Sequence, residues 1–219
     1  MNVVLTRLLE TLSPGAPVVF DADGTLWRGD VGEDFLRWAI HQHFIDAKYE
    51  TYEALLSQSH ARAYGWAVEV MAGLREDEVL EHTRRFFKER FAGRIFPFVR
   101  PLLAKLSAHP VWICSASPWW VVVPGAEALG VPLSQVIGVR CDVVDGRLSG
   151  TVHQPVPCGE GKVTWLQRAS LTPGLAVGNG ELDLDMLTFA KRPLVVTPAD
   201  SSNGLVAHAR RNDWPILIA

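Results

Sequence analysis

Two aspartates one residue apart, Asp21 and Asp23, directly follow the apolar run Val18–Phe20 and precede a glycine and a threonine. In an open α/β sheet, ligands gather at the carboxyl ends of the strands, where a glycine lets the backbone turn sharply. Two carboxylates at such a place can share Mg²⁺, which prefers oxygen ligands and offsets the repulsion between a carboxylate and an incoming phosphate. The alternative is an ordinary Asp-Gly turn. The complete pattern Phe-Asp-x-Asp-Gly-Thr favours the metal and phosphate interpretation.

A second apolar run ends in small hydroxyl residues. Val111–Cys114 is followed by Ser115, Ala116, Ser117 and a proline. Taken alone, a serine after a strand is more often a turn or cap residue, and Ser117 is a candidate helix cap.

A lysine and a glycine-rich turn follow further along the chain. Lys162 comes after Gly-Glu-Gly at the start of a predicted helix, where its ammonium could neutralise a phosphoryl group and Asp21. A solvated surface lysine is the alternative. Asn179 lies in a turn after the apolar run Leu175–Val177, and Asp183 falls near the next helix start. An amide oxygen can bind Mg²⁺ without adding charge, whereas Asp183 by itself would also suit the dipole of that helix.

These segments, in this order, resemble the motifs of the haloacid dehalogenase superfamily. The resemblance implies that Asp21 attacks phosphorus to give an aspartyl-phosphate, and that Asp23 protonates the leaving oxygen and later activates water. It also implies that Ser115 binds a phosphoryl oxygen, helped by the backbone amides that follow at Ala116 and Ser117. Because the dehalogenases of the superfamily lack an acid at Asp23, its presence favours phosphoryl transfer.

The resemblance extends to a metal loop of the form Gly-Asp-Gly-x-x-Asp. It implies a Mg²⁺ site built by Asp21, Asp23, Asn179 and Asp183, with Lys162 stabilising the transferred group. Asn179 departs from the family pattern because it stands where an acid is usual. The metal should therefore bind more weakly or depend on Asp183, and either residue could be the third protein ligand.

Short apolar runs bounded by turn residues predict strands buried on both faces of a parallel sheet. They are Pro17–Phe20, Val111–Cys114, Val136–Cys141, Leu175–Val177 and Pro193–Val196. Helical patterns lie between them, such as Val99–Ala108 and Val163–Arg168. This alternation predicts an α/β fold with a doubly wound parallel sheet, the Rossmann-like core of the superfamily. A turn at Asp145-Gly146 predicts a hairpin beside the sheet.

A stretch of about 60 residues between Val31 and Phe91 has apolar residues at helical spacing and no convincing strand. We expect a small helical cap inserted after the first strand, with residues 30–96 as the cap and residues 1–29 and 97–219 as the core.

This insert resembles the cap of the phosphoserine-phosphatase-like branch, in which an arginine shortly before a cap turn binds the substrate carboxylate. Matching that turn to Met71–Leu74 puts Ala67 at the arginine position, which argues against phosphoserine unless Arg62 substitutes.

Acids and aromatic residues are frequent near the insert. Trp27 and Glu33 are candidates for substrate contact, and Asp30, Tyr52 and Tyr64 lie nearby in the sequence. Aromatic faces beside carboxylates suit an ammonium group, as in phosphocholine or phosphoethanolamine. The alternative is that the aromatic residues form the packing core of the cap and that Glu33 faces solvent.

The chain has 219 residues, 48% of them hydrophobic, and a formal net charge of -3. It can bury a full core, and neither its charge nor any basic cluster favours nucleic acid or an anionic membrane as partner. We see no basic leader and no apolar run of about 18 residues, so we expect a cytoplasmic protein. The three cysteines lack metal-type pairing, and we expect reduced thiols.

The sequence thus predicts a magnesium-dependent phosphatase that hydrolyses a small phosphorylated metabolite and acts as a monomer or homodimer. One alternative is a phosphotransferase with an acceptor other than water. Another is a regulatory protein that binds a phosphorylated ligand with little turnover, because Asn179 removes one expected metal carboxylate.

Overall fold

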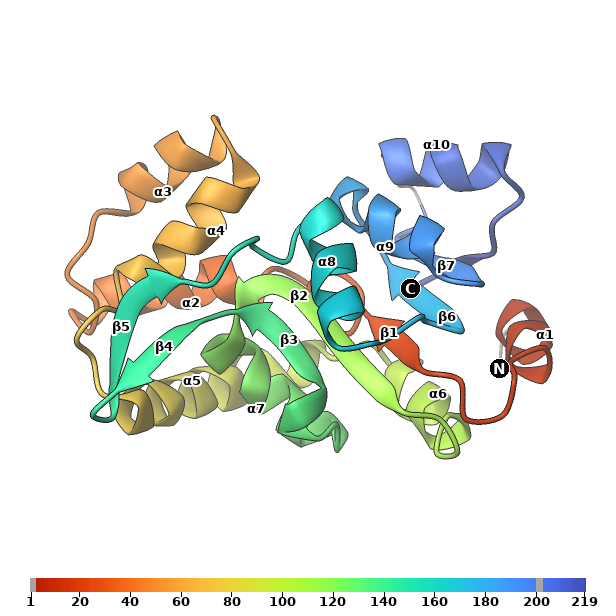
Figure 1. Ribbon diagram of the computed structural model, residues 1–219, viewed down its shortest axis with the longest axis horizontal. Coiled ribbons are helices and arrows are strands. Elements are labelled where there is room, and N and C mark those ends of the chain that lie inside the picture. Colours follow the sequence, from red (N-terminus) through yellow and green to blue (C-terminus); the bar gives the residue numbers. More distant parts are fainter. Residues whose placement is uncertain (1–2, 200–202) are drawn as a thin grey trace.

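The computed structural model describes residues 3–199 and 203–219, and a parallel sheet in the order β3-β2-β1-β6-β7-β8 lies at its centre (Figure 1). The strands are β1 (Val18–Phe20), β2 (Val111–Pro118), β3 (Val136–Val139), β6 (Leu175–Gly178), β7 (Pro193–Thr197) and β8 (Ile216–Ile218). The chain runs outward from β1 through β2 and β3, then crosses to the other side of β1 for β6, β7 and β8. This reversal confirms the predicted doubly wound α/β fold and opens a crevice at the carboxyl end of β1.

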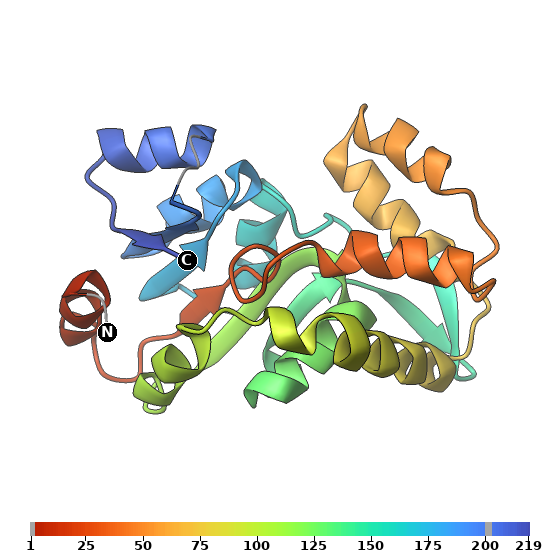
Figure 2. The ribbon, with the colours of Figure 1, turned by 180° about the vertical axis from the view of Figure 1, so that it is seen from behind.

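Helices cover both faces of this sheet (Figures 1 and 2). Val18 and Phe20 of β1 pack into one apolar core with α6 and α7, whereas Val19 points to the opposite face and packs with α8, α9 and α10. Successive strand residues face opposite sides of a sheet, so a strand that is apolar throughout is buried on both. These helices are α1 (Val3–Glu10), α6 (Val99–Lys105), α7 (Trp119–Leu129), α8 (Glu160–Arg168), α9 (Leu184–Phe189) and α10 (Gly204–Arg211).

Four helices occupy the chain between β1 and β2: α2 (Val31–His41), α3 (Tyr49–Leu56), α4 (His60–Glu69) and α5 (Glu76–Arg90). The carboxylate of Asp30 caps α2 by accepting a hydrogen bond from the backbone N–H of Glu33 at 2.8 Å. Phe35 and Phe86 meet edge to face, with ring centroids 5.5 Å apart, and join α2 to α5. The division at residues 30 and 96 stays a prediction.

A two-stranded antiparallel ribbon, β4 (Cys141–Val144) and β5 (Arg147–Val152), projects beside the cap helices (Figure 1). Asp145 and Gly146 both have positive φ, as a two-residue hairpin turn of type I′ requires, so the predicted hairpin is confirmed. The single strand predicted over Val136–Cys141 is wrong, because Arg140 separates β3 from β4 and the two belong to different sheets.

The ribbon is joined to the cap by backbone pairing. The N–H of Gly73 donates to the carbonyl of Leu148 at 2.8 Å, and the N–H of Leu148 donates to the carbonyl of Leu74 at 3.0 Å. The turn that follows α4 is therefore held by an element of the core.

The cysteines are free thiols, as expected. Within residues 3–199 and 203–219, no helix is both long enough and apolar enough to cross a membrane.

Candidate active site

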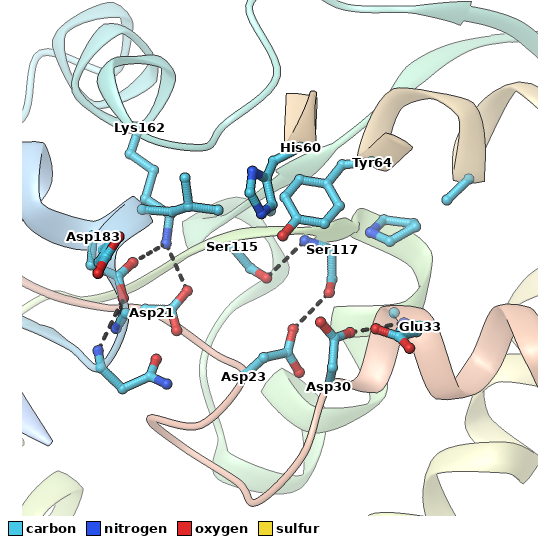
Figure 3. A pocket seen from close by; sticks show the side chains of 18 of the residues that line it. Asp21, Asp23, Asp30, Glu33, His60, Tyr64, Ser115, Ser117, Lys162 and Asp183 are labelled. Atoms are coloured by element: carbon cyan, nitrogen blue, oxygen red, sulfur yellow. Dashed lines mark hydrogen bonds and ion pairs between the residues drawn. The ribbon is translucent and has the colours of Figure 1, made fainter. Parts of the chain in front are cut away.

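A cavity of about 380 Å³ lies where the carboxyl ends of β1, β2 and β6 face the cap helices (Figure 3). Predicted site residues other than Trp27 line it, and they come from separate parts of the sequence. They are Asp21, Asp23, Glu33, Ser115, Ala116, Ser117, Lys162, Asn179 and Asp183.

Lys162 is the buried cation of the site. Its Nζ lies 2.6 Å from Asp21 Oδ1 and 2.6 Å from Asp183 Oδ1, and only 1% of the lysine side chain is exposed. Gly161 allows α8 to begin here, because a Cβ at that position would overlap the carbonyl oxygen of Val156. The ammonium thus lies beside the carboxylate that would attack a phosphoryl group, where it can offset charge in the transition state.

Asp183 holds the loop that follows β6. Its Oδ2 accepts hydrogen bonds from the backbone N–H groups of Asn179 and Gly180, both at 3.0 Å, while its other oxygen faces Lys162. Both carboxylate oxygens are therefore engaged within the protein. This pairing fixes the position of Asn179 relative to the end of β1.

Asn179 brings an amide group to the space beside Asp21. One terminal atom of this amide lies 3.2 Å from Asp21 Oδ2 and 2.8 Å from the main-chain carbonyl oxygen of Asp23. As nitrogen, that atom donates a hydrogen bond to both oxygens. As oxygen, it completes a group of oxygens spaced like adjacent ligands of Mg²⁺, which would be about 2.9 Å apart for metal bonds of about 2.1 Å.

These donors fit Mg²⁺, although carboxylates alone do not form the site. Among residues 3–199 and 203–219, no group of three or more His, Cys, Asp or Glu side chains could hold a metal ion. The fit comes instead from one carboxylate of Asp21, the carbonyl of Asp23 and the amide of Asn179. The Asp23 carboxylate points away from this group, so Asp23 contributes its main-chain carbonyl to it, and the set of metal ligands stays a prediction.

The Asp23 carboxylate is held by three donors on its cap side. Its Oδ1 accepts from Trp27 Nε1 and from the backbone N–H of Val31, both at 2.7 Å, and its Oδ2 accepts from Ser117 Oγ at 2.6 Å. Ser117 was a candidate helix cap, but its hydroxyl fixes Asp23 and makes no cap hydrogen bond to α7.

Burial changes the proton affinity of both acids. Burial and then the charge of Asp183 raise the pKa of Asp21, Lys162 opposes them, and the resulting pKa is about 7. Burial, followed by the charges of Asp30 and Asp21, holds the pKa of Asp23 well above its usual range, although the hydrogen bonds from Ser117 and Val31 lower it. The raised pKa of Asp23 favours its protonated form, whereas the ammonium beside Asp21 favours the ionised form of that carboxylate.

Ser115 is buried within β2, and its Oγ accepts a hydrogen bond from the backbone N–H of Ser117 at 3.0 Å. The hydroxyl proton of Ser115 is left to donate toward the cavity, which Ala116 also lines. This is the arrangement needed to bind an oxygen of a phosphoryl group.

The expected substrate contact of Trp27 is wrong. Its side chain is fully buried, packs edge to face on Phe87 with centroids 5.4 Å apart, and does not line the cavity. The indole instead orients Asp23 from behind, so Trp27 acts on the site indirectly.

The cap side of the cavity is acidic and aromatic. Asp30, Glu33, Tyr52 and Tyr64 line it, together with His60 at the start of α4. Glu33 is partly neutralised, because its Oε1 accepts from Tyr49 and from Arg37, both at 2.6 Å.

Lys162 supplies the cavity's positive charge, since no other lysine or arginine among the described residues lines it. Ala67 lies at the wall, and Arg62 pairs with Glu69 at 2.8 Å outside the cavity. Arg62 therefore does not provide a carboxylate-binding group.

Sequence reasoning missed some contributors to the site. Thr25 donates to Asp21 Oδ2 at 3.1 Å, and His60 faces the cavity. Thr25 is part of the first motif and could have been identified there. His60 is a single histidine at the start of a helix, and nothing in the residues around it predicts that it faces the cavity.

The doubly wound sheet, the cap and the acids, serine and lysine at the crevice define a class of α/β enzymes. The sequence profile of haloacid dehalogenase-like hydrolases matches residues 18–188, the span that carries all these side chains. The chain belongs to this family.

Phosphoserine phosphatase of Streptomyces coelicolor is 31% identical over 188 residues, which cover 79% of this chain and 42% of that protein. The chain thus spans less than half of this relative. The crystal structure of a protein of unknown function from Bordetella pertussis Tohama I superposes with a TM-score of 0.79 and is 19% identical in sequence. The superposition covers 94% of this chain and 99% of that protein. A phospho-aspartyl intermediate analogue of phosphoserine phosphatase gives 17% identity, 94% coverage of both chains and a TM-score of 0.61.

Proposed function

We propose that this chain is a magnesium-dependent phosphatase that hydrolyses a small phosphate monoester through an aspartyl-phosphate on Asp21. The observation that carries the proposal is the position of Asp21, with Lys162 Nζ at 2.6 Å on one oxygen and the Asn179 amide at 3.2 Å from the other. The similarity to proteins named phosphoserine phosphatase supports it.

The reaction proceeds in two displacements on phosphorus. The Asp21 carboxylate attacks in line, the bond from phosphorus to the leaving oxygen breaks, and Asp23 donates its proton to that oxygen. Asp23 then takes a proton from water, which attacks the aspartyl-phosphate and releases inorganic phosphate with Asp21 restored. Ser115 and Lys162 bind the phosphoryl oxygens throughout.

Asp21, the Asp23 carbonyl and Asn179 are the groups that would hold Mg²⁺, while Asp183 positions the loop that carries Asn179. When bound, Mg²⁺ supplies positive charge that offsets repulsion between Asp21 and the phosphate. An amide in place of a carboxylate lowers the negative charge of the site, so metal affinity should be modest.

The test is release of phosphate from p-nitrophenyl phosphate with and without Mg²⁺. Asp21→Asn should abolish turnover, whereas Asp46→Asn, a change of the same chemistry at an exposed position, should leave it intact. Full activity of Asp21→Asn, or activity unaffected by chelation of Mg²⁺, would exclude this mechanism.

We further infer that the leaving group carries an ammonium group and no carboxylate, as in phosphoethanolamine or phosphocholine. Asp30 lines the cavity and has no ion-pair partner among the described residues, and Tyr52 and Tyr64 line the same cavity. Burial raises the pKa of Asp30, and a bound cation would favour its ionised form. Ala67 offers no charge to a carboxylate.

A panel of phosphoethanolamine, phosphocholine, phosphoserine and glycerol 3-phosphate tests this substrate class. Asp30→Asn is the diagnostic variant, because asparagine also caps a helix and α2 should be retained. We expect a raised KM for the two cationic substrates and an unchanged KM for p-nitrophenyl phosphate. Preference of the unaltered protein for phosphoserine would contradict the substrate class and leave the phosphatase mechanism standing.

A regulatory protein that binds a phosphorylated ligand with little turnover is the second candidate, and the replacement of an acid by Asn179 favours it. Negligible magnesium-dependent turnover with all four phosphate esters, combined with tight binding of one of them, would establish that function instead.

A further inference from the structure

A second cavity of about 450 Å³ lies apart from the candidate active site and shares none of its lining residues. It opens beside β3, the edge strand of the main sheet, where the chain passes from β3 into β4. Trp165 of α8 and Glu76 at the start of α5 also line it. The core, the ribbon and the cap therefore all contribute to its walls.

Arg140, which separates β3 from β4, lies half-buried in this cavity. Its guanidinium carbon is 4.0 Å from the ring centroid of Trp119 and 5.9 Å from that of Trp120. Such stacking fixes the plane of the guanidinium and leaves its N–H groups to donate at the edges. Within residues 3–199 and 203–219, the Arg140 side chain donates no hydrogen bond and forms no ion pair.

The acids that line the cavity do not neutralise Arg140. Glu76 Oε1 accepts a hydrogen bond from Trp120 Nε1 at 2.9 Å, and Asp142 Oδ1 lies 2.8 Å from His153 Nε2. Burial lowers the pKa of Arg140, although Glu76 opposes the shift. The guanidinium of Arg140 has no ion-pair partner among the described residues, so an oxoanion that enters the cavity can take the place of water at its N–H groups.

The ring on which Arg140 stacks carries a buried donor without a partner. Trp119 Nε1 is buried without a hydrogen-bond partner, and no other buried side-chain nitrogen or oxygen in the described part of the chain shares this state. Val136, Ile137 and Trp165 add apolar surface to the cavity. A guanidinium without an ion-pair partner beside apolar walls, in a space of this size, is typical of a small-molecule site.

We propose that this cavity binds a small amphipathic anion. Its carboxylate or phosphate group accepts two hydrogen bonds from one edge of the Arg140 guanidinium, and its apolar body packs on Trp165. The N–H donors along one edge of a planar guanidinium are spaced to bind two oxygens of a carboxylate or of a phosphate. Glu76 and Asp142 also line the cavity, so they would repel a ligand that carries a second negative charge.

The experiment uses the whole ¹⁵N-labelled protein and records the side-chain Nε–Hε signal of Arg140 and the indole signal of Trp119. Benzoate is the carboxylate probe and phenylphosphonate the phosphate-like probe, which a phosphatase cannot hydrolyse at a P–O–C bond. Benzyl alcohol and sodium chloride at matched ionic strength are the controls for the ring and for charge screening. We expect saturable shifts of both signals with at least one anion and none with either control.

Two variants decide whether Arg140 is the binding group. Arg140→Gln should weaken binding by about tenfold or more, since a charge-assisted bidentate contact is lost. Arg85→Gln is the matched control and should leave binding unchanged, because Arg85 also stacks on a tryptophan, with its guanidinium carbon 5.2 Å from the ring centroid of Trp38, and neither residue lines this cavity.

Shifts that rise linearly without saturation, shifts equal to those with benzyl alcohol, or equal affinity of Arg140→Gln would overturn the proposal. If Arg140→Gln does not fold, the titration of the unaltered protein still decides, and Arg140→Lys retains the charge while removing the fork. A larger effect of benzoate than of phenylphosphonate would assign the site to carboxylates, and the reverse order would assign it to phosphates.

Discussion

Removal of the Ser117 hydroxyl should separate the two chemical steps of the proposed reaction. Ser117 Oγ lies 2.6 Å from Asp23 Oδ2, and Ser117→Ala leaves the donors from Trp27 and Val31 in place. A hydrogen bond to a charged group contributes about 1.5–3 kcal/mol. Its loss would raise the pKa of Asp23 further, because the ionised carboxylate loses a donor that stabilises it.

The second step should suffer most, because a higher pKa leaves less of Asp23 ionised and able to accept a proton from water, whereas p-nitrophenol is a good leaving group that needs little help from an acid in the first step. We expect kcat for p-nitrophenyl phosphate to fall roughly 10- to 100-fold. Rapid-quench measurements should show a burst of p-nitrophenol close to one equivalent per protein, with the aspartyl-phosphate accumulating during turnover.

The matched control is Ser149→Ala, at an exposed position of β5, which should retain the original kcat. An unchanged kcat and an unchanged phosphoenzyme level in Ser117→Ala would refute the reasoning. A fall in both steps with a lower melting temperature would instead indicate lost packing, because Gly32 lies directly against the Ser117 side chain.

Further predictions concern the metal and the thiols. Asn179→Asp should tighten Mg²⁺ binding about tenfold by calorimetry and lower the melting temperature of the metal-free protein, because it adds charge beside Asp21; unchanged affinity would argue against Asn179 as a ligand. Because burial and Asp183 raise the pKa of Asp21 to about 7 without metal, Mg²⁺ must displace a proton there at low pH. Mg²⁺ should therefore raise the melting temperature more at about pH 8 than at about pH 5, and equal shifts would contradict this. Iodoacetamide should modify Cys158 before Cys114, whose pKa burial raises to about 12; mass spectrometry of digested protein would show the reverse order if the thiols were misplaced.

The parts of the site that the sequence predicted are those fixed by local geometry. Asp21 and Asn179 follow directly after β1 and β6, and Lys162 lies in the first turn of α8. In a parallel sheet the carboxyl ends of neighbouring strands share one edge, so motifs at strand ends meet regardless of their separation in the chain. The hairpin at Asp145 was predictable for the same reason, because its turn type depends on two adjacent residues.

The parts that escaped prediction depend on contacts between distant segments. Trp27 is buried because α5 places Phe87 against it, and no pattern around Trp27 distinguishes a packed indole from one that faces a ligand. The orientation of Asp23 likewise depends on Ser117, 94 residues away in the sequence. The break of the β3–β4 segment at Arg140 follows from pairing with β5, which apolar composition cannot reveal.

The backbone pairing between the turn after α4 and β5 has a mechanical consequence. Any swing of the cap that admits a substrate must either carry the ribbon along or sacrifice the hydrogen bonds of Gly73 and Leu148. Breaking both hydrogen bonds would expose backbone N–H and C=O groups. The free energy required would exceed that of bending the connecting segments at the two ends of the ribbon. A cap that moves would therefore carry the ribbon with it and would bend at Arg140 and in the segment that leads from β5 to Lys162.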